Sequence, residues 1–469
     1  MLLRYRIGRC LEAVAAPIRK LLPHHAHREI DMVNGHVFSN VVRYSIPLIL
    51  SGMLQLLYNM ADVIVVGKFE NPEAVASVGA TSSLITLMVN LFIGLSVGAN
   101  VLVARYYGAG EKEQVSQAVH TSVLLSLLCG VVLIAVGVLL ARPLLELMGT
   151  PEDVIGQSVL YMRIYFAGMI PSLIYNVGAG LLRAVGDSKR PLYFLLFSAV
   201  INTIFDLLFV IVFHMGVDGV AYATILAQFL SALLVLFVLT HDHTPYSIRW
   251  HDLRLSRGMI RRILAIGLPS GVQQAITSFS NVFVQGYINF FGSACMAGWS
   301  SYNKLDVFVL IPMQSVALAL TTFVGQNYGA GHLDRARKGV RQALWMTLSI
   351  TAILCVGIIW GARPLNRLFT ADEEVLSHGV RFISIISPFY LACCFNQIYA
   401  GALRGAGDAK TPMYVMLFSF VLFRQVYLFI NRQMGNSFLG VTLAYPMGWV
   451  VCSILMVLFY RRSVAKGRC

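Results

Sequence analysis

Long apolar stretches separated by short polar loops run along almost the whole chain. Each stretch is about as long as the roughly 20 apolar residues that a helix needs to cross a bilayer. Unpaired backbone groups cannot remain in hydrocarbon, and the stretches are far too long for barrel strands, so each one is predicted to be a helix. We place twelve such spans at 41–67, 75–103, 117–140, 157–182, 191–213, 219–240, 263–290, 298–325, 340–361, 379–403, 412–431 and 438–460.

The composition also indicates a membrane protein. Hydrophobic residues make up 57% of it, charged residues only 12%, and the mean hydropathy is +0.71. A soluble globular domain carries roughly twice that share of charged residues. We therefore expect an all-α polytopic membrane protein.

The chain also contains an internal repeat of 221 residues. An even number of spans separates the two copies, so the halves are expected to share one orientation, as two parallel six-helix lobes. Paired lobes of this kind are typical of carriers that work by alternating access. Three segments recur at this spacing: YGAG at 107–110 and 328–331, ARPL at 141–144 and 362–365, and LLRAVGDSKRPLYFLLFS at 181–198 as ALRGAGDAKTPMYVMLFS at 402–419.

The basic residues predict how the chain is oriented. Most of the 36 lysines and arginines fall in the N-terminal tail, in the loops after even-numbered spans and in the C-terminal tail. Basic flanks are retained on the cytoplasmic side, so both termini are predicted to be cytoplasmic, with the protein in the plasma membrane. The expected division is a basic amphipathic tail, an N-lobe, a cytoplasmic inter-lobe linker, a C-lobe and a second basic tail, at 1–37, 38–240, 241–262, 263–460 and 461–469.

The net charge of +14 fits this loop bias and an attraction to anionic lipid headgroups, so we expect the bilayer and no nucleic acid as a partner. The N-terminal tail is predicted to rest on the inner leaflet, kinked at Pro17. His24, His25 and His27 could bind a metal there, although a solvated basic tail does not favour it. The eight cysteines show neither zinc spacing nor a disulfide pattern.

Acidic residues inside the spans are the clearest candidates for chemistry. Of 22 acids, only Asp62, Asp206 and Asp306 fall within predicted spans. A charge at the centre of a membrane helix costs about 2.5–3.5 kcal/mol, so it defaults to being functional or specifically paired. Asp62 shares a helix face with Tyr58, and Asp206 shares one with Asn202.

These side chains, with the hydroxyl of Thr224, form a set of hard oxygen ligands that suits a small cation. The same carboxylates could hold protons instead, because burial and like charge favour the neutral form. Alternatively, Asn202 and Asp206 only form hydrogen bonds between neighbouring helices. Shifting by the repeat places Phe423, Tyr427 and Tyr445 at the equivalent positions, which confines the expected coupling site to the N-lobe.

The C-lobe spans carry other polar residues. Asp306, close to Lys304, is either a structural anchor or a substrate contact, and Arg424 has no evident partner in the sequence. The uncharged candidates for contacts with a substrate are Gln273, Gln274, Asn281 and Asn396.

Several segments in order resemble the multidrug and toxic compound extrusion (MATE) family. They are IPLILSGMLQLLYNMADVIVVG, VGANVLVARYYGAG, GLLRAVGDSKRPLY and NTIFDLLFV, and the resemblance covers about residues 38–462. It implies an antiporter, not an enzyme, that exports organic, cationic or amphipathic compounds. The resemblance implies H⁺ or Na⁺ as the coupling ion and no cofactor, and we expect a monomer.

The resemblance also implies roles for particular residues. Positions matching Asp62, Asn202, Asp206 and Thr224 form the family's N-lobe cation site, and Gln55, Tyr58 and Asn176 match the polar network around it. Pro47, which removes a backbone donor, is expected to let the first span bend. Spans 263–290 and 379–403 lack the acids of the NorM-like branch, which favours the DinF-like type.

Two other functions share features with this sequence. A lipid-linked oligosaccharide flippase of the same superfamily would share the two lobes, but it should line its cavity with arginine and lysine. Apart from the basic residues assigned to the flanks of spans, only Lys304 and Arg424 lie in spans. A membrane enzyme would need a nucleophile, metal or paired-histidine group, and none is evident. The absence of a P-loop argues against direct drive by ATP.

Overall fold

The computed structural model describes residues 29–69, 72–242 and 244–467. Every regular element within these ranges is helical, so the expected all-α fold is confirmed. The amphipathic segment predicted in the N-terminal tail, with Pro17 and the three histidines, lies outside the described residues.

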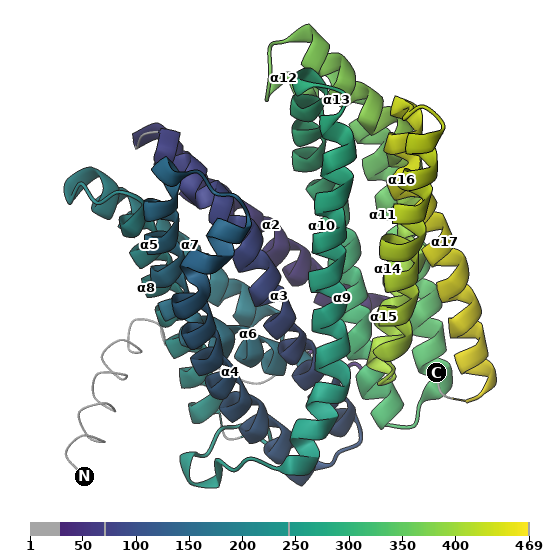
Figure 1. Ribbon diagram of the computed structural model, residues 1–469. Coiled ribbons are helices and arrows are strands. Elements are labelled where there is room, and N and C mark those ends of the chain that lie inside the picture. The colour runs from purple at the N-terminus through teal and green to yellow at the C-terminus, as the bar shows by residue number, and fades with distance from the viewer. Residues whose placement is uncertain (1–28, 70–71, 243, 468–469) are drawn as a thin grey trace.

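The first half of the chain forms one bundle, drawn from purple to teal in Figure 1. Its helices are α2 (Val37–Phe69), α3 (Pro72–Gly108), α4 (Lys112–Leu147), α5 (Glu152–Ala167), α6 (Met169–Ala184), α7 (Lys189–Leu207), the π-helical turn η1 (Leu208–Val212) and α8 (Val217–His241).

The second half follows after the short turn η2 (Trp250–Asp252) and is drawn from green to yellow in Figure 1. Its helices are α9 (Arg257–Asn289), α10 (Ser293–Gly329), α11 (Leu333–Trp360), α12 (Ala362–Arg367), α13 (Glu373–Ile386), η3 (Ser387–Phe389), α14 (Tyr390–Gly405), α15 (Lys410–Met416), η4 (Leu417–Phe423), α16 (Arg424–Gln433) and α17 (Phe438–Ala465).

The lengths and composition of these helices suit a membrane. Within the described ranges, ten helices are long and apolar enough to cross one, or eleven if the bent pair α5–α6 counts as a single span. The remaining expected span, at 263–290, corresponds to α9, which is long enough at 33 residues but is not among the helices that are apolar enough. Large apolar side chains such as Leu139, Ile353 and Trp360 are exposed, as expected for positions that face hydrocarbon.

The span expected at 157–182 differs from the prediction, because it consists of two helices. α5 and α6 meet at Gly168 with a bend of 49°. A Cβ atom at Gly168 would lie only 2.4 Å from the side chain of Ile225 in α8. Glycine therefore permits a close approach between helices that the apolar pattern does not reveal.

The loops 185–188 and 406–409, which are related by the repeat, share one local structure. Gly186 and Gly407 both have a left-handed backbone, with φ of 96° and 92°. Asp187 then accepts hydrogen bonds from the backbone N–H groups of Lys189 and Arg190, both at 3.1 Å. Asp408 does the same for Thr411 at 3.0 Å. In both halves, a glycine therefore ends one helix and an aspartate caps the start of the next.

The two bundles meet at one end, which we call the joined end and define by the loops 109–111, 185–188, 330–332 and 406–409. A Cβ atom at Gly108 would lie 2.0 Å from the carbonyl oxygen of Gln326, and the Gln326 amide donates to the carbonyl of Ala184 at 2.7 Å. In Figure 1 the two bundles diverge from this end toward the far end, where α12 and α13 lie.

Helix α2 contributes to both bundles. Its first half packs on the second bundle, where Val41 and Tyr44 share a buried cluster with Leu320 and Phe323 of α10. The Tyr44 hydroxyl also donates to the carbonyl of Arg183 in the first bundle at 2.6 Å. The helix that carries Asp62 is therefore attached to both bundles.

Candidate ion-coupling site

Helices α2 and α7 bring together the two carboxylates that the sequence singled out. Tyr58 and Asp62 are four residues apart on α2, and Asn202 and Asp206 are four apart on α7, so each pair shares a helix face. Asp62 lies close enough to interact with both Asp206 and the hydroxyl of Thr224 on α8. Three helices thus converge on one polar cluster inside the first bundle.

This cluster is buried and poor in hydrogen-bond partners. Asn202 and Asp206 are 0% exposed, and none of their side-chain nitrogen and oxygen atoms has a hydrogen-bond partner. Among the ion pairs of the described residues, none involves Asp62 or Asp206. Since buried charges are costly unless they are paired or coordinate an ion, this cluster is suited to take up a small cation or a proton.

The donor set also limits which ions fit. Two carboxylates, an amide oxygen and hydroxyl oxygens are hard ligands, which suit an alkali cation or a proton better than a soft transition metal. In the described part of the chain, no group of three or more histidine, cysteine or acidic side chains could hold a metal. A multi-carboxylate centre for a resident metal is therefore not formed by these residues.

Two aromatic residues that the sequence reasoning missed complete the cluster. Tyr161 and Tyr165 on α5 lie close enough to Asp62 to interact with it, and their rings stack at 6.2 Å. Gln228 on α8, one turn after Thr224, lies beside Tyr165. Tyr161 and Tyr165, like Thr224 and Gln228, are four residues apart and so share a helix face. This spacing was the only signal in the sequence, and it is equally common among ordinary core residues.

The other residues of the expected network form hydrogen bonds within their own helices. Gln55 is exposed and donates to Asn59 at 3.3 Å. The Asn176 side chain donates to the carbonyl of Ser172 at 2.8 Å. Pro47 is buried, and its carbonyl accepts a hydrogen bond from Ser51 at 2.8 Å.

The backbone changes its winding directly after Asp206. α7 ends at Leu207, and the turn Leu208–Val212 is π-helical. Single π-helical turns inside α-helices occur frequently at functional sites, because they realign the side chains around them. The sequence contained no proline or glycine that would have predicted this turn.

The repeat-related positions in the second bundle form a different environment. Phe423 and Tyr427 stack on each other at 6.5 Å, and the guanidinium of Arg424 lies 4.7 Å from the ring centre of Tyr445. Arg424 donates to the Ser280 hydroxyl at 2.6 Å and to the Asn281 amide oxygen at 2.9 Å. Its partners are thus uncharged oxygens and a ring rather than a carboxylate.

Asp306 is held by two phenols. It accepts hydrogen bonds from Tyr302, at 3.3 Å, and from Tyr390, and the two hydroxyls lie 2.8 Å apart. Lys304 does not pair with it, because the Lys304 ammonium lies over the ring of Phe369 at 5.0 Å.

The uncharged candidates in the second bundle differ in burial. Gln273 is buried and donates to the sulfur of Met416 at 2.7 Å, whereas Gln274 is partly buried. Asn396 is 0% exposed, and its amide nitrogen has no hydrogen-bond partner.

Comparison with known proteins decides the family. The MatE family model matches two segments of equal length, residues 47–208 and 269–430, which together cover more than half of the chain. The chain belongs to the MatE family. This family consists of transporters, and the two matched segments coincide with the two halves of the repeat.

Individual relatives match this chain over nearly its whole length. The probable multidrug resistance protein YoeA from Bacillus subtilis (strain 168) is 29% identical over 92% of this chain and 95% of its own length. The probable multidrug resistance protein YpnP from the same organism is 27% identical over 92% and 96%. A MOP superfamily transporter from Pyrococcus furiosus Vc1 (DSM3638) shares the fold, with a TM-score of 0.89 at 24% identity over 94% of this chain and 99% of its own.

Proposed function

We propose that this MatE transporter is a cation-coupled antiporter that exports organic compounds, and that H⁺ or Na⁺ binds at Asp62 and Asp206. The observation that carries the proposal is the meeting of these two carboxylates inside the first bundle, away from any basic side chain. Thr224 and Tyr58 supply uncharged oxygens beside Asp62, and Asn202 lies one turn before Asp206 on α7. Pairing with an ion or a proton would remove the cost of burying two like charges.

The proposed cycle links ion binding to movement of the bundles. A cation at Asp62 and Asp206 would draw α2 toward α7, and Pro47 offers a weak point at which α2 can bend. Because the first half of α2 packs on α10, such a bend would change the contact between bundles. An ion entering along the membrane potential supplies about 2.3 kcal/mol per charge per 100 mV for the return step.

The proposed orientation places the joined end in the cytoplasm, with both termini there and the protein in the plasma membrane. Basic residues lie in the first turns of the helices that follow the loops at this end, for example Lys112, Arg190, Arg335 and Lys410. Basic loops of membrane proteins are retained on the cytoplasmic side. On this orientation the bundles diverge toward the outside. The expected domains, with an N-lobe at 38–240, a linker at 241–262 and a C-lobe at 263–460, belong to the same proposal.

The proposed substrates are cationic or amphipathic organic molecules. Two relatives are named as probable multidrug resistance proteins, and the second bundle holds a carboxylate, Asp306, next to aromatic rings. Carboxylates and ring faces both attract organic cations. Spans 263–290 and 379–403 contain no acids, which supports assigning this chain to the DinF-like type of the family. In that type, only one lobe carries the ion-coupling site.

Transport by the purified protein in sealed vesicles tests the proposal. Efflux of a fluorescent organic cation is measured under an imposed Na⁺ gradient and, separately, under an imposed pH gradient. We expect one of the two gradients to drive transport. We expect the variants Asp62→Asn and Asp206→Asn to lose this gradient-driven transport. Asp153→Asn, an exposed acid in the first turn of α5, is the matched control. Gradient-driven transport by both site variants at unchanged rates would overturn the proposal.

A further inference from the structure

Residues 29–36, which precede α2, form an ordered strap at the joined end. The Asp31 carboxylate accepts hydrogen bonds from the backbone N–H groups of Val33 and Asn34, both at 2.9 Å. Gly35 has a left-handed backbone with φ of 75°, and the Asn40 side chain donates to the carbonyl of Asn34 at 2.8 Å. These local bonds give the strap a defined turn, so it can transmit force between its two ends.

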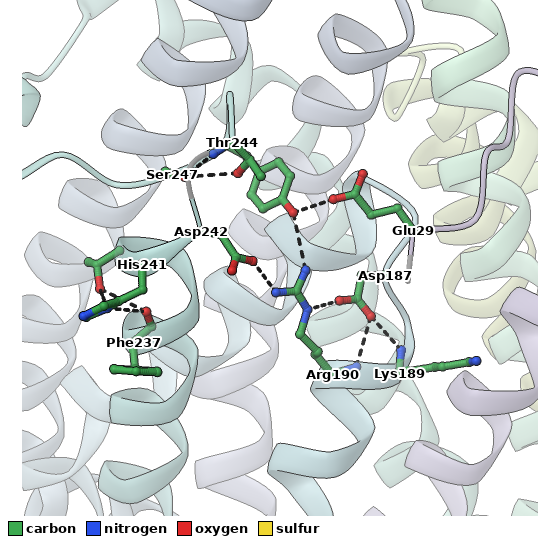
Figure 2. A network of polar contacts seen from close by, with 11 residues as sticks. Glu29, Asp187, Lys189, Arg190, Phe237, His241, Asp242, Thr244 and Ser247 are labelled. Carbon is green, nitrogen blue, oxygen red and sulfur yellow. Dashed lines mark hydrogen bonds and ion pairs between the residues drawn. The ribbon is translucent and has the colours of Figure 1, made fainter. Parts of the chain in front are cut away.

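One end of the strap is attached to the first bundle. The backbone N–H of Ile30 donates to the carbonyl of Gly186 at 3.1 Å. The Glu29 carboxylate accepts hydrogen bonds from two phenols, that of Tyr107 on α3 at 2.7 Å and that of Tyr246 in the linker. Figure 2 shows Glu29 in the same polar network as Arg190 and Asp187.

The attachment point is itself rigid. Arg190 forms ion pairs with both Asp187 and Asp242, and its guanidinium also donates to the Tyr246 hydroxyl at 3.4 Å (Figure 2). Burial and the hydrogen bond to Glu29 raise the pKa of Tyr246, so its phenol stays protonated and continues to donate. Glu29 therefore binds to a surface that the linker, the loop after α6 and α7 build together.

The other end of the strap is attached to the second bundle. The Asn327 amide donates to the carbonyl of Met32 at 2.9 Å, and the Met32 side chain is 0% exposed in the cluster with Phe323. Arg335 on α11 donates to three successive parts of the strap, the carbonyls of Met32, Asn34 and Gly35, at 3.3, 2.7 and 2.9 Å. Bonds from a charged guanidinium are among the stronger hydrogen bonds in proteins.

We propose that the strap, residues 29–36, is a latch that holds the two bundles together at the joined end. It spans the boundary between them, with Glu29 and Ile30 on one side and Met32 to Gly35 on the other. The bundles cannot separate at this end unless one attachment breaks. The importance of this latch for transport rests on the proposed alternating-access function, whereas its mechanical role does not.

Fluorescence energy transfer in single molecules tests the latch without transport. The full-length protein in detergent carries dyes at positions 113 and 410, through non-canonical amino acids, on exposed starts of α4 and α15. Arg335→Ala removes the three bonds to the strap, and Arg341→Ala removes an exposed charge from the same helix. We expect the fraction of molecules with separated joined ends to rise about ten-fold in Arg335→Ala only.

The repeat supplies a second, independent pair of variants. Gly186→Ala and Gly407→Ala impose the same strain on equivalent left-handed residues. A Cβ atom at Gly186 would lie 2.5 Å from the carbonyl oxygen of Ile30, whereas one at Gly407 would approach only the flexible Arg105 side chain, at 3.5 Å. We expect Gly186→Ala to increase separation and Gly407→Ala to leave it unchanged, with similar thermal unfolding midpoints for both.

Two results would overturn the latch. Either Arg335→Ala and Gly186→Ala show the same distance distribution as their controls, or all four variants separate equally. Because the measurement needs neither ion nor substrate, it is independent of the transport test of Asp62 and Asp206. If the proposed coupling function failed but this test succeeded, the strap would still be one of the elements that join the bundles.

Discussion

Gly94 of α3 lies against the backbone of Gly267 in α9. A Cβ atom at Gly94 would be 2.3 Å from the Gly267 carbonyl oxygen, and one at Gly98 would be 3.0 Å from the Gly267 Cα. Both helices present small residues four apart, Gly94 and Gly98 on α3 and Gly267 and Gly271 on α9. Such pairs of small residues let membrane helices pack closely across a boundary.

Substitutions at this crossing should destabilise the protein. A side chain in Gly271→Ala would meet the carbonyl oxygen of Leu91 at 2.1 Å, so the helices must move apart. We expect a loss of about 1–3 kcal/mol in the free energy of unfolding, typical of overpacking. Gly286→Ala on the same helix, where no atom lies within 4 Å, should be neutral or stabilising. Thermal unfolding midpoints in detergent compare the two, and equal midpoints would contradict the close contact.

The buried ion pairs of Arg190 should contribute far more to the stability of the protein than exposed ion pairs do. Asp187 is 0% exposed, so Arg190→Ala leaves a buried carboxylate without its partner. We expect a loss of about 3–5 kcal/mol in the free energy of unfolding. The matched variant Arg142→Ala breaks a pair whose side chains are 67% and 53% exposed, and it should cost less than about 1 kcal/mol. Thermal denaturation of both variants measures the difference, and similar losses would argue against the network in Figure 2.

The hydroxyl of Thr224 should contribute to binding of the coupling ion. It donates to the carbonyl of Val220 at 3.0 Å, so its lone pairs can face a cation beside Asp62. Thr224→Val should lower the apparent affinity for the coupling ion about ten-fold, whereas Thr224→Ser should retain it. The measurement is the initial transport rate as a function of ion concentration. Thr203→Val on α7 removes a hydroxyl with the same kind of bond and serves as the control. Equal affinities in the two valine variants would exclude Thr224 from the site.

Asp306 should affect stability more than coupling. Asp306→Ala removes the acceptor of Tyr302 and Tyr390, and we expect a loss of about 1–3 kcal/mol in the free energy of unfolding. Asp306→Asn keeps an acceptor oxygen and should lose less, with ion-driven transport retained. Thermal midpoints and vesicle transport are the two measurements. If Asp306→Asn abolished ion-driven transport as Asp206→Asn is expected to do, coupling would not be confined to the first bundle.

The sequence predicted the charged and polar residues of the site better than the aromatic residues around them. Asp62, Asn202, Asp206 and Thr224 were found because a charged or polar group inside an apolar span stands out from its neighbours. Tyr161 and Tyr165 were missed, because aromatic residues are ordinary in membrane helices and only the packing of α5 turns them toward Asp62. For the same reason, Gln55 was expected in the network although its hydrogen bond stays on α2.

The sequence by itself determined the features that depend on neighbouring residues. The helical spans follow from runs of apolar residues, the repeat from matching segments, and the turn at Gly186 and Asp187 from local backbone preferences and capping. Only the tertiary structure decided which contacts form between helices. The meeting of Asp62 with Asp206, the bend at Gly168 and the strap between the bundles each depend on side chains far apart in the chain. Such contacts are set by how whole helices pack, which no local pattern encodes.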